Sequence, residues 1–468
     1  MIDRKLLNET VKIAAEYFEK IESRHVGPVN SVKEIRDKLS MGLPEEGEDP
    51  VKVIQDMATK VDGGLVASPG PRYFGFVTGG VVPASLAADW MTSVWDQNGV
   101  LSVSSPAAGV VEEIVSNWIL ELLRFPTNCS VGMVTGCQMA NFTCLAAARH
   151  EVLRRVGWDV ESKGLNGAPE ISIVAGEEAH ATLINALKML GFGTDNIIQV
   201  PSDSNGAMIP KKLKEALEDI DGPLIVNLQA GNVNTGAFDP FKEIIDVAHE
   251  KGAWVHVDGA FGLWGRVTPE LGDELEGVEK ADSWATDAHK WLNVPYDSGL
   301  AIVANEAAHR TSMALKAPYY IAASDETRDP SQWVPESSRR ARGFALYGAI
   351  RSLGGEGIRE IVERNCRQAR LMASLLEEDP AIEILNEVIL NQVLVHFLPP
   401  EGIGSGAFNG EVISVIQEEG TCWAGSSRWK GMDAMRVSVS NWSTTDKDIN
   451  ISASAIRKVL AECRERHS

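Results

Sequence analysis

Two side chains that could do chemistry stand at the ends of apolar segments in the middle of the chain. The segment HVDGAFG (residues 256–262) places Asp258 directly after an apolar run, and SWATDAHKWLNVPYDSG (residues 283–299) places Lys290 thirty-two residues later. A lysine flanked by tryptophans and apolar residues is unusual at a surface that faces water. Lys290 is therefore either an incidental lysine whose stem lies along an apolar surface, or a buried amine with a chemical task.

Asp258 also has two interpretations. An aspartate at the end of a strand often caps the turn that follows. Alternatively, its carboxylate binds the cationic ring nitrogen of a ligand. An acid and a lysine at the ends of neighbouring strands can face one cofactor from opposite sides. A Schiff-base lysine paired with an aspartate at a pyridinium nitrogen is typical of pyridoxal phosphate (PLP) sites, so the two residues together favour that cofactor.

A PLP site also needs a phosphate-binding element. The segment VTGCQMANFTCLAAARH (residues 134–150) runs from an apolar stretch through Gly136, Cys137 and Gln138 into an alanine-rich helix. The N–H groups and the dipole at the start of a helix bind phosphate. Many strand-to-helix turns share this pattern, so it is weak by itself. It matches neither GxGxxG nor GxxxxGK[ST], which disfavours a dinucleotide or a nucleoside triphosphate.

The elements that must position these residues follow from the periodicity of the middle third. Apolar runs of strand length alternate there with segments whose apolar residues recur at helical spacing. The strand segments are ISIVAG, PLIVNLQA, AWVHVDGA and GLAIVAN, and the helical segments are ATLINALKMLG, KKLKEALEDI and FKEIIDVAHEK. This alternation predicts a mostly parallel sheet with helices on both faces, with functional groups at the carboxyl ends of the strands.

The flanking segments predict further elements. The N-terminus is expected to form an amphipathic helix, an arm whose apolar positions are Leu7, Val11, Ala14, Phe18 and Ile21. Residues 322–338 are polar and contain two prolines, which predicts a long loop. Residues 338–355 return to a helical pattern, and a smaller α+β domain is expected after them.

Composition narrows the class of protein. The 468 residues are 44% apolar and 23% charged, as in a globular protein, and the formal charge of −21 argues against binding to nucleic acid or to an anionic membrane. We find no run of eighteen apolar residues and no signal peptide. The six cysteines lack the spacing of a metal site, so we expect no metal and a reduced, cytoplasmic protein.

The motifs resemble those of the group II PLP-dependent amino acid decarboxylases, the aromatic-L-amino-acid and glutamate decarboxylase type. HVDGAFG is similar to the family pattern HVDAA[YF]G, and AHKWLNVPYDS to PHKWLxxxxDC/S. The resemblance runs from PRYFGFVTGG (residues 71–80) through WDQNGVLSVSSPAAGVVEE to MRVSVSNWSTTDKDI. It implies an α/β protein of PLP-dependent transferase fold type I, the aspartate aminotransferase fold, with a mostly parallel seven-stranded sheet and helices on both faces. The implied parts are an N-terminal helical arm (1–70), a large PLP-binding domain (71–320), a mobile loop with a connecting helix (321–355) and a small C-terminal α+β domain (356–468).

The resemblance also implies roles for single residues. Lys290 would bind the cofactor as an internal aldimine, with His289 beside it near the phosphate. Asp258 would keep the pyridine nitrogen protonated, and Ala260 would pack under the ring. His180 matches the histidine that stacks on the ring in this family, although a lone histidine in such a sequence is more often structural.

Further positions follow from the same resemblance. Gly136, Cys137 and Gln138 fall at the phosphate-binding turn. Gly354 would reach the phosphate of the partner subunit, or would only end a helix. Phe76 and Val77 lie where the family lines its substrate pocket, so the resemblance implies that they contact the substrate.

The implied reaction is decarboxylation of an L-amino acid to its amine and CO₂ through an external aldimine and a quinonoid. The alternative is another PLP reaction on the same scaffold: oxidative decarboxylation–deamination to an aldehyde, transamination or carbon–carbon lysis. The sequence suggests a small or medium substrate and does not exclude an aromatic one. Because two chains build such sites, we expect a homodimer with active sites at the subunit interface.

Two departures from the family pattern bear on these expectations. Pro330 stands where the aromatic decarboxylases carry a loop tyrosine that is thought to protonate the intermediate, and Tyr319 and Tyr320 lie upstream. Asp287 and Ala288 replace the Asn-Pro pair that precedes His-Lys. An aspartate near a phosphate is unfavourable, so we expect its side chain to point elsewhere or to take a proton or a bridging water.

Overall fold

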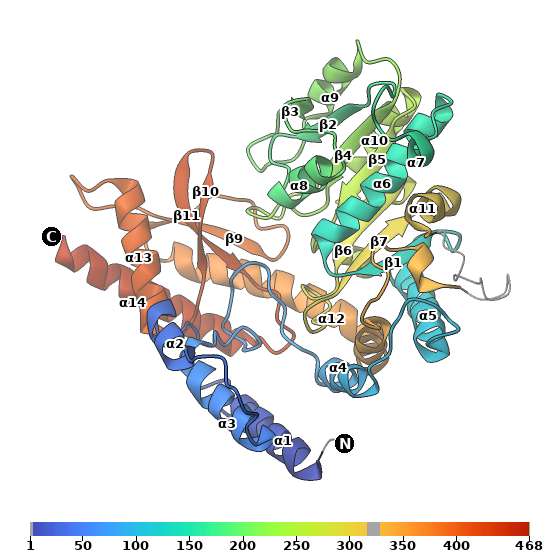
Figure 1. Ribbon diagram of the computed structural model, residues 1–468. Coiled ribbons are helices and arrows are strands. Elements are labelled where there is room, and N and C mark those ends of the chain that lie inside the picture. Colours follow the sequence, from blue (N-terminus) through green and yellow to red (C-terminus); the bar gives the residue numbers. More distant parts are fainter. Residues whose placement is uncertain (1–2, 316–327, 468) are drawn as a thin grey trace. The chain divides into compact units, whose positions relative to one another are not determined.

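The structure is a computed structural model that describes residues 3–315 and 328–467. It divides into two compact units (Figure 1). One comprises Met1–Thr78, Leu371–Leu385 and Leu394–Ser468, and the other comprises Gly79–Arg370 and Asn386–Val393. The N-terminal segment thus belongs to the same unit as the C-terminal segment, while the four-part division expected from the sequence stays a prediction.

A sheet of seven strands in the order β1-β7-β6-β5-β4-β2-β3 forms the centre of the larger unit as described. The strands are β1 (Ser130–Val134), β2 (Ser172–Gly176), β3 (Ile197–Val200), β4 (Leu224–Gln229), β5 (Trp254–Asp258), β6 (Ser283–Asp287) and β7 (Gly299–Val303). Strand β2 pairs in parallel with β3 and β4, and β5 pairs in parallel with β4 and β6, whereas β7 runs antiparallel to β1 and β6. The predicted mostly parallel α/β sheet is confirmed.

Burial of the strands shows that both faces of this sheet are covered. Every residue of β1, β5, β6 and β7 is buried, which requires packing on both sides. Helix α6 lies across β5, β6 and β7 (Figure 1). The helices of this unit are α4 (Pro83–Trp95), α5 (Pro106–Leu122), α6 (Cys137–Arg155), α7 (Val160–Lys163), α8 (Ala181–Met189), α9 (Pro210–Leu217), α10 (Phe241–Glu250), α11 (Glu306–Met313) and α12 (Gly343–Glu377), the last up to Arg370.

The strand directions bring the carboxyl ends of β1, β5 and β6 to one edge of the sheet. Asp258 is the last residue of β5 and Asp287 the last of β6, and these strands are parallel. Strand β1 runs in the same direction, because β7 is antiparallel to both β1 and β6. The turn from β1 into α6 therefore lies at the edge where Asp258 and Asp287 end their strands.

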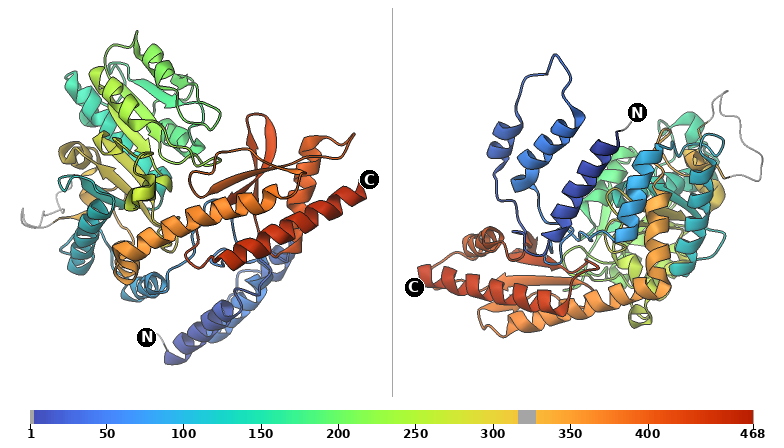
Figure 2. Two further views of the ribbon diagram at one scale, coloured as in Figure 1. Left: turned by 180° about the vertical axis from the view of Figure 1, so that it is seen from behind. Right: turned by 90° about the horizontal axis from the view of Figure 1, so that it is seen from below.

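The smaller unit contains a four-stranded sheet in the order β10-β11-β9-β8. Its strands are β8 (Ile382–Ile384), β9 (Gln392–Phe397, of which residues from Leu394 belong here), β10 (Gly425–Trp429) and β11 (Met432–Ser438). Its helices are α1 (Arg4–Glu19), α2 (Val32–Leu39), α3 (Pro50–Val61), α13 (Ser405–Glu419) and α14 (Asp446–Arg466). Helices α1 and α3 pack side by side (Figure 2), so the N-terminal arm is a helical layer rather than a single helix.

Three predicted boundaries differ from the structure. Helix α1 ends at Glu19, so Ile21 lies beyond it. The helix predicted over residues 338–355 begins at Gly343, because the chain before it pairs with Asn98: the Arg339 N–H donates to Asn98 Oδ1, and Arg340 forms an isolated β-bridge with Asn98. In the predicted loop, residues 322–327 lie outside the described part of the chain, and Pro330 is buried in a short 3₁₀ turn.

Candidate active site

Asp258 lies at the centre of a group of buried hydrogen-bond donors. Its Oδ1 accepts from Cys137 Sγ at 3.3 Å and from the Ala260 N–H at 3.2 Å, and its Oδ2 accepts from Asn141 Nδ2 at 3.0 Å. The residue is only 4% exposed. Donors on both oxygens stabilise the ionised carboxylate in a buried place, which is what a partner for a cationic ring nitrogen requires.

A second row of buried side chains fixes the orientation of Asn141. Its Oδ1 lies 2.9 Å from His256 Nε2, while Nδ1 of the same imidazole lies 2.9 Å from Ser283 Oγ. Trp254 Nε1 donates to that Ser283 oxygen at 2.9 Å. Asn141 donates its amide N–H to Asp258, so its Oδ1 accepts from Nε2–H of His256, and in a neutral imidazole Nδ1 then accepts from the Ser283 hydroxyl.

This order of donors requires a neutral His256. Burial lowers the pKa of His256 to about 4, and the nearby Asp258 carboxylate offsets part of that effect. A neutral Nε2–H tautomer leaves the Asn141 amide group to face Asp258 as a donor. Trp254, Ser283, His256, Asn141 and Asp258 therefore form one continuous series of hydrogen bonds between the sheet and α6.

Lys290 lies three residues after the end of β6 and is paired with Asp287. Its Nζ is 2.9 Å from Asp287 Oδ2, and Oδ1 of the same carboxylate accepts the Cys137 N–H at 2.6 Å. His289 Nε2 lies 3.3 Å from Asp287 Oδ1. The Asp287 side chain is 2% exposed and that of Lys290 is 20% exposed. Lys290 is thus a mostly buried amine with a buried counter-ion.

The charges around these groups set their protonation. Burial by itself lowers the pKa of Lys290, but the Asp287 carboxylate, with a smaller effect of Asp258, reverses this and leaves the pKa raised. Burial and the same two carboxylates hold the pKa of the Cys137 thiol well above its usual value. Cys137 is therefore a thiol that donates to Asp258, and Lys290 is an ammonium in this arrangement. Burial lowers the pKa of His289, against the opposing charge of Asp287.

The turn before α6 is tightly packed against His289 and against Gly299 of β7. A Cβ on Gly136 would lie 3.1 Å from His289 Cε1, and one on Gly299 in β7 would lie 2.5 Å from the Gly136 Cα. The first amide of α6, that of Cys137, points to the Asp287 carboxylate. Gln138 directs its side chain to Met189 Sδ at 3.9 Å. The predicted turn from β1 into α6 is present, with a carboxylate of this chain at its first amide, and its role in binding phosphate stays a prediction.

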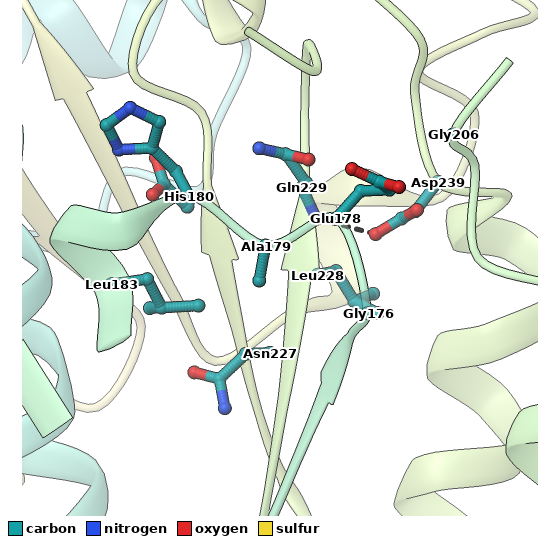
Figure 3. Close-up of a pocket in the computed structure, with 11 residues that line it drawn as sticks. Gly176, Glu178, Ala179, His180, Leu183, Gly206, Asn227, Leu228, Gln229 and Asp239 are labelled. Carbon is teal, nitrogen blue, oxygen red and sulfur yellow. Dashed lines mark hydrogen bonds between the residues drawn. The ribbon is translucent and has the colours of Figure 1, made fainter. Parts of the chain in front are cut away.

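His180 lies near Asp258 on the same edge of the sheet. Both line one small pocket with Asn227 and Gln229 of β4, and Figure 3 shows His180 on the loop that joins β2 to α8. His180 caps α8, because its Nδ1 accepts the Thr182 N–H at 3.3 Å. This bond fixes the orientation of the ring. A structural role as a helix cap and a role beside a cofactor ring are therefore compatible.

The remaining predicted residues are Gly354, Phe76 and Val77. Gly354 interrupts α12 with a left-handed φ of 63°, and a Cβ there would meet no atom within 4 Å. This geometry fits the interpretation as a glycine between two helical segments. Phe76 and Val77 lie in the smaller unit, where Phe76 is exposed and packs against Trp423, and Val77 is buried. Their predicted role as substrate walls stays a prediction.

Asn141, His256 and Ser283 are functional candidates that were not predicted from the sequence. Asn141 lies one helical turn after Cys137, so both face the end of β5 from α6. His256 precedes Asp258 by two residues and therefore points to the same face of β5. The periodicities of a helix and of a strand could have indicated the first two residues, but the contact between them depends on the packing of α6 on the sheet.

This constellation of a buried lysine, a buried aspartate and a helix start agrees with comparisons to known proteins. Residues 33–397 match the family model described as the pyridoxal-dependent decarboxylase conserved domain. The chain belongs to this family. The expected cofactor, PLP, and the expected reaction class, carboxy-lyase, are thereby confirmed, and the chain is a PLP-dependent amino acid decarboxylase.

The similarity to individual relatives covers nearly the whole length of this decarboxylase. Tryptophan decarboxylase 1 of Oryza sativa subsp. japonica is 26% identical, with 98% of this chain and 94% of that protein covered. Phenylacetaldehyde synthase of a Rosa hybrid cultivar is also 26% identical, with 95% and 91% covered. The crystal structure of Oryza sativa TDC with PLP and tryptamine superposes with a TM-score of 0.90 at 23% identity, covering 98% of each chain, which shows the shared fold.

Proposed function

We propose that Lys290 and Asp258 form the catalytic centre of this decarboxylase, which converts an L-amino acid to its amine and CO₂. One observation carries the proposal. Cys137, at the start of α6, bonds Asp258 through its thiol and bonds the counter-ion of Lys290, Asp287, through its N–H. The acid, the amine and the helix start thus lie within one hydrogen-bonded group, as a ring nitrogen, an aldehyde and a phosphate on one cofactor require.

These residues fit PLP at two of its three anchoring points. Asp258 is a buried acceptor for the ring nitrogen, and Lys290 is a mostly buried amine for the aldehyde. Gly136 leaves the helix start open to a phosphate, although Asp287 lies at that amide. When bound, PLP supplies an electron-withdrawing ring that accepts the electron pair left at Cα as CO₂ departs.

The proposed roles follow from the charges and contacts. Asp258, bonded by Asn141, Cys137 and Ala260, would keep the ring nitrogen protonated. His180 would cover the ring, with Ala260 under it. Lys290, as a free amine beside the cofactor, would carry a proton to or from the reacting carbon. A buried site favours loss of CO₂, because the carboxylate charge is dispersed as the bond breaks.

The product is open to one alternative. The loop tyrosine expected in aromatic decarboxylases is absent at Pro330, and an aldehyde synthase is among the relatives. Both observations support a test for oxidative decarboxylation–deamination, which would yield an aldehyde and hydrogen peroxide. Phe76 and Val77 remain the proposed substrate contacts, and the substrate remains an L-amino acid of small to medium size or an aromatic one.

The assembly we propose is a homodimer with active sites at the subunit interface. Exposed apolar side chains on the N-terminal helices support a protein partner for this layer, namely Leu7, Val11, Phe18, Val53 and Met57. The family resemblance makes a second copy the expected partner. Sedimentation equilibrium of the purified protein measures the assembly directly, and a monomer at micromolar concentration would contradict it.

We propose a cytoplasmic location. Within residues 3–315 and 328–467, no helix is long and apolar enough to cross a membrane. All six cysteines are free and buried, which fits a reducing compartment. Burial raises the pKa of Cys129 to about 11 and that of Cys366 to about 12, so both are unreactive thiols at neutral pH.

Lys290→Ala tests the catalytic centre. We expect the parent protein, incubated with PLP, to show the absorbance band of a lysine-bound cofactor near about 420 nm, and the variant to lack it. Lys280→Ala is the matched control, because Lys280 lies at the surface and pairs with Asp246. A panel of L-amino acids is then assayed for CO₂ and for hydrogen peroxide.

Each result has one meaning. CO₂ without peroxide supports simple decarboxylation, whereas peroxide in proportion to CO₂ shows aldehyde synthesis. A band that survives in Lys290→Ala, or a parent protein that never forms the band with added PLP, would overturn the assignment of Lys290.

A further inference from the structure

Asp287 occupies a position that a cofactor phosphate would also need. Its Oδ1 accepts the Cys137 N–H, the first amide of α6, at 2.6 Å. Its Oδ2 lies 2.9 Å from Lys290 Nζ, and the side chain is almost completely buried. One carboxylate thus satisfies both the helix start and the amine that would bond the cofactor aldehyde.

We propose that Asp287 is an internal anion that takes the place of the cofactor phosphate at the start of α6 and holds Lys290 as an ammonium until PLP displaces it. The proposal rests on the proposed function and adds a role for a residue that has no part in it. Asp287 is in this sense a positioning residue of the cofactor-free protein, which opposes loading with PLP.

The physical argument has two steps. A phosphate and a carboxylate cannot both accept the same Cys137 N–H, and two buried anions at contact distance repel each other strongly. Lys290 must also lose its proton before it can attack an aldehyde, and the ion pair with Asp287 keeps that proton in place. Asp287 therefore opposes PLP binding at the phosphate end and at the aldehyde end.

The same contacts stabilise the protein without cofactor. A buried ammonium with no counter-ion is unfavourable, and an unsatisfied N–H at the start of α6 adds to this. Removing the charge of Asp287 should therefore have opposite effects on two quantities. The cofactor-free protein should become less stable, and the affinity for PLP should rise. If Asp287 were merely structural, its substitution would lower both the stability of the cofactor-free protein and the affinity for PLP.

Asp287→Asn is the test variant, because an asparagine Oδ1 can still accept the Cys137 N–H but carries no charge. We expect the dissociation constant for PLP, measured by fluorescence titration, to fall by about tenfold or more, as removal of a like charge at short range predicts. We expect the melting temperature of the cofactor-free protein to fall. Inorganic phosphate alone should raise that melting temperature more in the variant than in the parent.

Asp282→Asn is the matched control. Asp282 precedes the other end of β6, and its carboxylate also accepts a backbone N–H, that of Val255, at 2.8 Å. It should leave the PLP dissociation constant unchanged within about twofold, because it lies away from the start of α6. Asp287→Ser provides a second neutral variant with an oxygen acceptor, in case the asparagine variant does not fold.

The outcomes separate this inference from the proposed function. If the parent forms the PLP band and Lys290→Ala loses it, but the neutral Asp287 variants bind PLP no more tightly, the inference is wrong and the catalytic centre stands. If the neutral variants bind PLP more weakly, Asp287 assists the cofactor and the inference is likewise overturned. A parent that never binds PLP refutes the proposed function itself.

Discussion

The buried imidazole of His256 makes the stability of this protein depend on pH. His256→Gln removes the titrating group but keeps a polar side chain in the row between Asn141 and Ser283. Burial lowers the pKa of His256 to about 4 in the folded chain, whereas an unfolded histidine titrates near 6.5. The unfolded chain therefore binds the proton first as the pH falls.

The sign and size of the effect follow from that difference. The stability due to a neutral His256 is fully present above pH 6.5 and is lost as the pH falls toward about 4. Between pH 7.5 and pH 5.0, a gap between 6.5 and about 4 corresponds to a loss of about 2 kcal/mol in the free energy of unfolding. The variant should be less stable at pH 7.5 but should lose about 2 kcal/mol less on acidification.

Urea unfolding at the two pH values, followed by tryptophan fluorescence, measures this difference. Ser283→Ala is the control, because it removes a hydrogen bond from the same row and retains the buried imidazole. It should be destabilised at both pH values and should keep the loss that the parent shows. Equal losses in His256→Gln and in the parent would refute a neutral His256 and, with it, the donor order that directs Asn141 to Asp258.

Two further predictions concern buried polar contacts. Asn141→Leu removes the amide donor of Asp258, so we expect the free energy of unfolding to fall by about 2–4 kcal/mol. The absorbance of bound PLP should also shift toward the form with an unprotonated ring nitrogen, and an unchanged spectrum would contradict the role of Asn141. Glu112→Gln leaves Arg339, which lies 2.7 Å away and is equally buried, without its counter-ion. Urea unfolding should show a loss of about 3–5 kcal/mol, and a loss below about 1 kcal/mol would show that the pair is not needed for stability.

Local patterns in the sequence were sufficient for much of the fold. The strands β2, β4, β5 and β7 and the helices α8, α9 and α10 lie within one to three residues of the segments that the periodicity predicts. The spacing of apolar residues within one short segment indicates whether that segment forms a strand or a helix, so these elements can be predicted from local sequence. The start of α12 could not be predicted in this way, because Arg339 and Arg340 pair with Asn98, which lies far away in the sequence.

Some residues of the candidate site were likewise predicted from the sequence, and others were found only in the tertiary structure. The sequence by itself was enough to propose Lys290 and Asp258, because their motifs contain them and the predicted parallel sheet places both at its carboxyl edge. Only the tertiary structure placed Asn141 beside Asp258 and Asp287 at the start of α6. Those contacts join α6 to β5 and β6 across more than a hundred residues. The charge and the hydrogen bonds that a buried side chain experiences come from packed neighbours, and which neighbours pack is decided by the assembly of the whole sheet with its helices.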